Sequence, residues 1–174
     1  MREAGRTVRI GILSDTHLDG PWNPEPFRRL LSGPFAGVER VLHAGDVGDY
    51  DWLTAVALAG VPVTAVAGNC DEQDDPRLPA RRILDIHGYR IGLIHGWGDA
   101  ARTPHRVARA FAQDDVNAVV FGHTHQPHLA TGGQVTYFNP GSMFWPRNSR
   151  ESVGLLTLSA GRPKWTHITL EGSR

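Results

Sequence analysis

Short apolar runs alternate with polar turns along the first half of the chain. Residues 8–14, 38–43 and 61–67 are rich in β-branched and other apolar side chains, and each run is typical of a buried strand. Between them, residues 27–31, which follow a proline, and residues 52–59, with Asp51 as N-cap, are predicted to be helices. This alternation of strands and helices predicts βαβ units with parallel strands.

Hairpin signals dominate the second half. Three pairs of apolar runs each surround a turn signal. His87-Gly88-Tyr89 separates residues 82–87 from 90–95, Gly132-Gly133 separates 127–131 from 134–138, and Gly161 separates 152–159 from 164–170. A helix is predicted from Thr103-Pro104 to Gln113, followed by a strand over residues 117–121. We therefore expect a mostly antiparallel second half, in one domain spanning residues 1–174 whose first seven residues form a disordered tail.

Five of the predicted strands end in a turn that carries side chains able to bind a metal. These side chains are Asp15 and His17, Asp46, Asn69, His95, and His123 and His125. In open α/β sheets, ligands gather outside the carboxyl ends of the strands, so distant turns can converge there. If strand geometry continues past Phe121, His123 and His125 face the same side, since residues i and i+2 do so in a strand.

Each of these pieces also has a plain alternative explanation. The two late histidines could be ordinary surface residues, Asp-x-His a helix cap, Gly-Asp a turn, and Gly-Asn a left-handed residue. Their occurrence together, each after an apolar run, favours a metal site. The mixture of carboxylate, amide and imidazole donors suits Mn, Fe, Co, Ni or Zn and suits Ca poorly. Seven donors are too many for one tetrahedral ion and fit two ions that share a carboxylate.

The order Asp-x-His, Gly-Asp-x-x-Asp, Gly-Asn-x-Asp, His, Gly-His-x-His resembles the calcineurin-like metallophosphoesterases. The Cys in Gly-Asn-Cys-Asp and the later Asn-Pro-Gly-Ser resemble their small bacterial and archaeal phosphodiesterase branch, to which the retromer subunit is related. The resemblance implies an α/β fold, a four-layer αββα sandwich with two mixed β-sheets flanked by helices. It also implies a first ion on Asp15, His17, Asp46 and His125, a second on Asp46, Asn69, His95 and His123, and His43, Asp49 and Asp71 beside these ligands.

The activity implied is hydrolysis of a small phosphodiester by a hydroxide that bridges two divalent ions, Mn above all, at Asp46. Two residues depart from the common pattern: Cys70 stands where many relatives have a His thought to protonate the leaving group, and Trp97 replaces another His. Arg147 could contact the phosphate, and Trp97 could stack on an aryl or base ring. A phosphomonoesterase with the same site and a non-catalytic protein-interaction scaffold remain alternatives.

Composition and charge limit the classes of binding partner and the cellular compartment that we expect. The formal net charge is zero and the pI about 7.1, which argues against an extensive surface for nucleic acid or an anionic membrane. Apolar runs stay far below the ~20 residues of a membrane span. A single cysteine cannot form an intrachain disulfide, which fits a reducing compartment, so we expect a cytoplasmic protein. The exposed-loop pair Phe144-Trp145 suggests an interface with a second copy of the chain.

Overall fold

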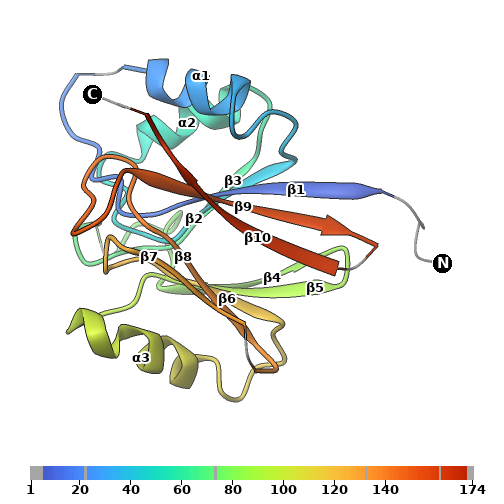
Figure 1. Cartoon of the computed structure of the whole chain (residues 1–174). Coiled ribbons are helices and arrows are strands. Elements are labelled where there is room, and N and C mark those ends of the chain that lie inside the picture. Colours follow the sequence, from blue (N-terminus) through green and yellow to red (C-terminus); the bar gives the residue numbers. More distant parts are fainter. Residues whose placement is uncertain (1–5, 22, 73, 132, 161, 172–174) are drawn as a thin grey trace.

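Two five-stranded β-sheets face each other in the computed structural model, which describes residues 6–21, 23–72, 74–131, 133–160 and 162–171 (Figure 1). The first sheet has the order β10 (Arg162–Thr169), β9 (Ser152–Ser159), β1 (Thr7–Leu13), β2 (Arg40–His43) and β3 (Val63–Ala65). The second has the order β4 (Arg81–Ile86), β5 (Tyr89–Ile94), β6 (Ala118–Val120), β8 (Thr136–Pro140) and β7 (Pro127–Ala130).

Each sheet contains three parallel strands with antiparallel strands beside them. In the first sheet β1, β2 and β3 run parallel, and β9 and β10 extend the β1 side as an antiparallel hairpin. In the second sheet β5, β6 and β8 run parallel, while β4 and β7 pair with the outer members in the antiparallel sense. The carboxyl ends of parallel strands lie at one edge of each sheet, and this arrangement gathers the loops discussed below.

Helices cover the outer faces of the two sheets (Figure 1). The helices α1 (Glu25–Ser32) and α2 (Asp51–Leu58) lie over the first sheet, and α3 (Thr103–Ala110), preceded by the 3-10 turn η1 (Ala100–Arg102), lies over the second. Apolar side chains fill the space between layers: Ile10 and Ile12 meet Leu93 and Phe138 between the sheets. Further clusters form around Phe27 under α1 and α2, and around Val107 and Phe111 under α3.

The predicted four-layer αββα architecture is therefore confirmed. The expectation of a mostly antiparallel second half was too simple, because β5, β6 and β8 are parallel. Thr7, which the sequence assigned to the tail, begins β1 and pairs with Ser159, whereas residues 1–5, Gly132 and Gly161 lie outside the described residues. The last helix ends at Ala110 rather than Gln113. Among the described residues, no helix is long and apolar enough to cross a membrane.

Candidate metal centre

The loops that follow β1, β2, β3, β5 and β6 carry all seven predicted ligands. Asp15 and His17 follow β1, Asp46 follows β2, Asn69 follows β3, His95 directly follows β5, and His123 and His125 follow β6. Backbone hydrogen bonds tie these loops together: the Asp15 N–H donates to the Gly45 carbonyl at 3.0 Å, and the Gly122 N–H donates to the His95 carbonyl at 3.0 Å. The topology thus brings side chains from both sheets to one place.

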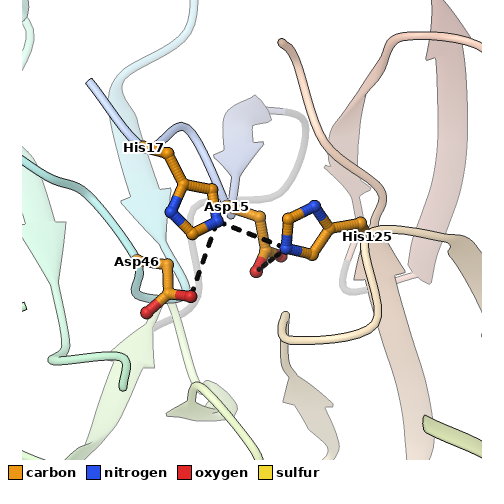
Figure 2. Close-up of side chains that lie close together, drawn as sticks. All are labelled: Asp15, His17, Asp46 and His125. Atoms are coloured by element: carbon orange, nitrogen blue, oxygen red, sulfur yellow. Dashed lines mark hydrogen bonds and ion pairs between the residues drawn. The ribbon is translucent and has the colours of Figure 1, made fainter. Parts of the chain in front are cut away.

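Four of these side chains form a first group (Figure 2). One ligand atom from each of Asp15, His17, Asp46 and His125 lies within 4.8 Å of the others. The His17 Nε2 atom is 3.2 Å from His125 Nε2 and 3.6 Å from Asp46 Oδ2, and His125 Nε2 is 3.4 Å from Asp15 Oδ1. Two carboxylates and two imidazoles at this spacing are a donor set that suits a divalent transition metal.

A second group adjoins the first through Asp46. The Asn69 Oδ1 atom is 3.2 Å from His95 Nε2 and 3.0 Å from His123 Nδ1. The His95 Nε2 atom is in turn 3.3 Å from Asp46 Oδ2, the same oxygen that faces His17. Asp46 Oδ2 therefore stands between the two groups, which is the position a shared ligand would take.

Backbone carbonyls orient three of the histidines. Nδ1–H of His95 donates to the Ala44 carbonyl at 2.7 Å, and Nδ1–H of His125 donates to the Trp145 carbonyl at 2.5 Å. His123 is turned the other way, so that its Nε2–H donates to the Gly98 carbonyl at 2.7 Å. In each ring the remaining nitrogen faces the centre, where the neutral imidazole offers a lone pair to a cation.

The ligand loops adopt a backbone conformation that side chains other than glycine rarely take. Positive φ angles occur at Asp15 (52°), His17 (43°), Asp46 (53°), His123 (68°) and His125 (56°). Each such residue costs about 1–2 kcal/mol, and clusters of them mark functional sites. The prediction that His123 and His125 extend a strand is therefore wrong. They converge because two left-handed residues turn the loop, and they join different groups.

Two glycines let the loops approach the carboxylates. A Cβ atom on Gly68 would lie 2.1 Å from Asp46 Oδ1, and a Cβ atom on Gly122 would lie 2.8 Å from Asp15 Oδ2. Any larger residue at either position would push a loop away from its carboxylate, so the close packing of this centre depends on both glycines.

The two carboxylates respond differently to burial in the metal-free protein. Burial raises the pKa of Asp15 to about 7, although the His95 charge and the hydrogen bonds from Ser14 and from the His123 N–H oppose this. Burial acts in the same direction on Asp46, but its hydrogen bond and ion pair with His95 and the Cys70 N–H outweigh it and lower its pKa. Burial lowers the pKa of His95, yet Asp46 and Asp15 together raise it above its ordinary value. The negative charge of these two carboxylates therefore favours a positive charge at this centre.

Of the residues expected beside the ligands, Asp71 has the clearest structural role. It is buried, and its Oδ1 and Oδ2 atoms accept the Gly48 and Gly68 N–H groups at 3.0 and 2.7 Å, which ties two ligand loops together. Asp49, by contrast, is exposed, and its carboxylate accepts the Asp51 N–H at 2.9 Å at the start of α2.

His43 supports the loop after β1. It is fully buried, and its Nε2 atom is 2.9 Å from the Thr16 hydroxyl, which donates to the Val47 carbonyl at 3.0 Å. Burial lowers the pKa of His43 to about 3, so the ring is neutral. The ring donates its Nε2–H to Thr16, and the Nδ1 atom has no hydrogen-bond partner among the described residues. His43 thereby fixes Thr16, the residue between two ligands.

Sequence reasoning missed a set of buried polar residues that hold the loops. The Asn139 Nδ2 group donates to the Gly122 carbonyl at 2.8 Å, and the Ser142 hydroxyl donates to the Asp15 carbonyl at 2.7 Å. The Ser14 hydroxyl lies 2.7 Å from Asp15 Oδ2 and 2.8 Å from the Gly141 carbonyl. Asn139 and Ser142 belong to the Asn-Pro-Gly-Ser segment, which contributed to the family resemblance but was given no role at the centre. Asn139 lies in β8 and Ser142 follows it. The segment itself was the available signal, because it follows an apolar run as the ligand turns do.

The residues expected to act on the substrate lie at three different places. Cys70 is exposed, and partial desolvation of the thiol together with the Asp46 charge raises its pKa. Arg147 lines a pocket of about 480 Å³ with His17, His125, Trp145 and Pro146. Trp97 is exposed on the loop that reaches His123 through Gly98, and it is not among the residues that line this pocket.

Comparison with known proteins gives a consistent picture. Residues 8–161 match the calcineurin-like phosphoesterase superfamily domain. A probable metallophosphoesterase of Methanothermobacter thermautotrophicus is 32% identical over 149 residues, which cover 86% of this chain and 85% of that protein. The Escherichia coli phosphodiesterase YfcE is 36% identical over 104 residues, 54% of this chain and 52% of YfcE. The structure of vacuolar protein sorting 29 from Cryptosporidium parvum covers 98% of this chain and 100% of its own, at 20% identity and a TM-score of 0.71, and so shares its fold.

Proposed function

Because the chain belongs to the calcineurin-like phosphoesterase superfamily, we propose that it is a phosphodiesterase that works with two divalent transition-metal ions. One observation carries this proposal. The seven donor residues form two adjoining groups, and Asp46 Oδ2 lies 3.6 Å from His17 Nε2 in one group and 3.3 Å from His95 Nε2 in the other. A carboxylate oxygen in that position suits two ions held a few ångströms apart.

Each residue of the centre has a defined task in this proposal. Asp15, His17, Asp46 and His125 would hold one ion, and Asp46, Asn69, His95 and His123 the other. Such a pair of ions would supply a hydrolytic nucleophile from water at neutral pH and would stabilise charge on the phosphate. The carbonyls that accept from His95, His123 and His125 keep the imidazoles turned inward, so the protein does not have to reorganise when the ions bind.

Two features support a diester with a good leaving group as substrate. The residue after Asn69 is a thiol with a raised pKa, a poor hydrogen-bond donor, so departure of a basic leaving group receives little help here. Aryl diesters need less of this help. The relative from E. coli that matches about half of the chain is named a phosphodiesterase. Among the ions, we propose Mn as the best activator, with Fe, Co, Ni or Zn as alternatives that share the preference for mixed oxygen and nitrogen ligands.

We also propose that the enzyme works in the cytoplasm on a small substrate. A single cysteine, which is exposed and free, is compatible with a reducing compartment. The zero formal net charge offers no broad attraction for nucleic acid or an anionic membrane.

The test combines metal analysis with a pair of assays. The protein is purified without chelator, its metal content is measured, and hydrolysis of bis(p-nitrophenyl) phosphate is compared with that of p-nitrophenyl phosphate. We expect two ions per chain and faster hydrolysis of the diester. Asp46→Asn should lose most of the activity and at least one ion. Asp85→Asn, which replaces an exposed carboxylate of β4 that accepts the Gly88 N–H, should behave as the wild type.

The alternatives give distinct results in the same experiment. Faster hydrolysis of the monoester would identify a phosphomonoesterase. A folded protein that hydrolyses neither ester with any of the transition ions would point to a non-catalytic scaffold. Two ions and full activity in Asp46→Asn would contradict the role given to this residue.

A further inference from the structure

Trp145 is a large aromatic residue whose side chain is exposed to solvent. It is 51% exposed, and it is one of three large hydrophobic side chains that are exposed among the described residues. Its neighbour Phe144 packs against the cluster under α1 and α2, so the two aromatic residues expected to act together point to different environments. Burial of an indole ring would contribute to stability, so its exposure indicates that the ring has another role, such as binding a ligand.

The exposed indole lies beside the metal centre. Trp145 and Arg147 line the pocket of about 480 Å³ together with His17 and His125, two members of the first ligand group. This volume is within the range of small-molecule sites. None of the arginine ion pairs formed by the described residues includes Arg147, which leaves its guanidinium available to an anion. The pocket therefore adjoins the first ligand group, next to where a phosphate held by the metal centre would lie.

The wall of the pocket is fixed relative to His125. The Trp145 carbonyl accepts the His125 Nδ1–H at 2.5 Å, and the Trp145 N–H donates to the Ser142 hydroxyl at 2.9 Å. The Arg147 N–H donates to the His125 carbonyl at 3.3 Å. All three bonds use backbone groups of Trp145 and Arg147. They therefore keep the indole and the guanidinium close to His125, while these two side chains stay free of the bonds that orient it.

We propose that this pocket binds a planar ring carried by the phosphoester substrate, an aryl group or a nucleobase, which stacks on Trp145 while Arg147 pairs with a phosphate oxygen. This inference rests on the proposed function and names the class of substrate for the same centre. A flat ring gains from stacking on indole even where one side stays open to water, as in base recognition by exposed aromatic residues. An alkyl ester lacks that contact, so the pocket selects for the ring.

Phosphonates test the pocket without hydrolysis, because their C–P bond is not a phosphoester. The Mn-loaded protein is titrated in a calorimeter with phenyl-, cyclohexyl- and methylphosphonate. These compounds carry a flat ring, a ring of similar size that is not flat, and no ring. We expect phenylphosphonate to bind about tenfold more tightly than methylphosphonate, with cyclohexylphosphonate in between. Trp145→Ala should reduce this ratio to about twofold or less, and Trp145→Phe should retain most of it.

The variants separate ring binding from phosphate binding. Arg147→Gln should weaken all three phosphonates by a similar factor and keep their ratio. Arg150→Gln, on the same loop but outside the pocket lining, and Leu129→Ala, another exposed apolar residue, should match the wild type. Metal content should be unchanged in Trp145→Ala, because the Trp145 group that accepts from His125 is the backbone carbonyl, which alanine keeps.

Three results would overturn the inference. One is that the wild type binds phenylphosphonate no more tightly than methylphosphonate, or that Trp145→Ala keeps the wild-type ratio of these affinities. Another is no binding of any phosphonate. The third is a wild-type dimer that Trp145→Ala dissociates, which would assign the indole to an interface between copies. Hydrolysis of bis(p-nitrophenyl) phosphate, measured in parallel, separates the two proposals: a hydrolase without ring preference contradicts only this one, and ring preference without hydrolysis contradicts only the proposed function.

Discussion

Replacing Asp15 with Asn should stabilise the metal-free protein at pH 8, although it removes a metal ligand. Asp15 is fully buried, and burial raises the pKa of its carboxyl from 3.8 to about 7. Between these two values the folded protein binds more protons at this site than the unfolded chain does, so the wild-type free energy of unfolding falls as the pH rises through this window. A shift of about 3 units corresponds to about 4 kcal/mol at pH 8. The neutral amide does not incur this loss.

The local hydrogen bonds make Asn a good substitute for the protonated carboxyl. The Ser14 hydroxyl has one proton, yet it lies within hydrogen-bond distance of both Asp15 Oδ2 and the Gly141 carbonyl. When residue 15 donates to the Ser14 oxygen, the Ser14 proton is free for the Gly141 carbonyl. The Ser14 oxygen and the Gly141 carbonyl then each accept one hydrogen bond. The Asn Nδ2 group can donate in this way, while its Oδ1 accepts the His123 N–H that Asp15 accepts at 3.0 Å.

The assay is urea unfolding of the chelated wild type and Asp15→Asn from pH 4 to pH 8. The advantage of the variant should grow by up to about 4 kcal/mol over this range, mostly below pH 7. Asp46→Asn is the matched control, because burial raises the Asp46 pKa but His95 and the Cys70 N–H lower it further. Ionised Asp46 therefore stabilises the fold above the unfolded pKa, and its replacement should destabilise the metal-free protein at pH 7. A difference between Asp15→Asn and wild type that is equal at pH 5 and pH 8 would refute this reasoning.

Three further predictions concern the loops, the leaving group and the ions. Asp71→Asn keeps one oxygen, now uncharged, for the Gly48 and Gly68 N–H groups and turns an NH2 donor toward the other. It should therefore lower the free energy of unfolding by about 1.5–3 kcal/mol and Mn affinity by about 10–100-fold, measured by urea unfolding and calorimetry. The exposed Asp85→Asn, which affects one similar bond in a turn, should cost under about 1 kcal/mol and leave Mn affinity unchanged; equal effects of the two would contradict the role of Asp71. Cys70→His should raise turnover of alkyl diesters more than that of aryl diesters, since a positioned acid contributes about 10²–10⁴-fold where the leaving group is basic. A large loss for aryl diesters in Cys70→Ala, with metal content intact, would instead show that the thiol takes part. After chelation, activity should return with Mn and far less with Ca, and equal recovery would contradict the ligand shell described here.

The ligand types and their order could be predicted from the sequence because a buried strand has a simple local signature. An apolar run such as residues 8–14 can be stable only between other layers, and the polar residues that follow it must lie at the sheet edge. Repeated five times, this pattern identified all seven donor residues that the structure brings together. The resemblance to the phosphoesterases then supplied the αββα layers and the pairing of ligands into two sets, which periodicity alone could not reach.

Pairing between distant strands was decided by the tertiary structure. β9, near the end of the chain, lies beside β1, and β8 lies beside β6 rather than only beside its hairpin partner β7. Such neighbours are selected by the packing of whole faces, as where Phe138 meets residues of both sheets, and no local pattern encodes that choice. This pairing creates the sixth parallel strand, and with it the loop that carries Ser142, Trp145 and Arg147.

The fine geometry of the centre likewise exists only in three dimensions. Strand geometry would have placed His123 and His125 on one face, but left-handed backbone at both sends their rings to the two different groups that the family resemblance implied. Which nitrogen of each ring faces inward depends on the Gly98 and Trp145 carbonyls, which come from other loops. The Asp71 carboxylate joins two ligand loops, and the Asp49 carboxylate instead bonds to the start of α2, for the same reason. The sequence determined which side chains could bind a metal, because residue chemistry and strand ends are local properties. Their orientation required the folded chain, because every group that orients them is distant in sequence.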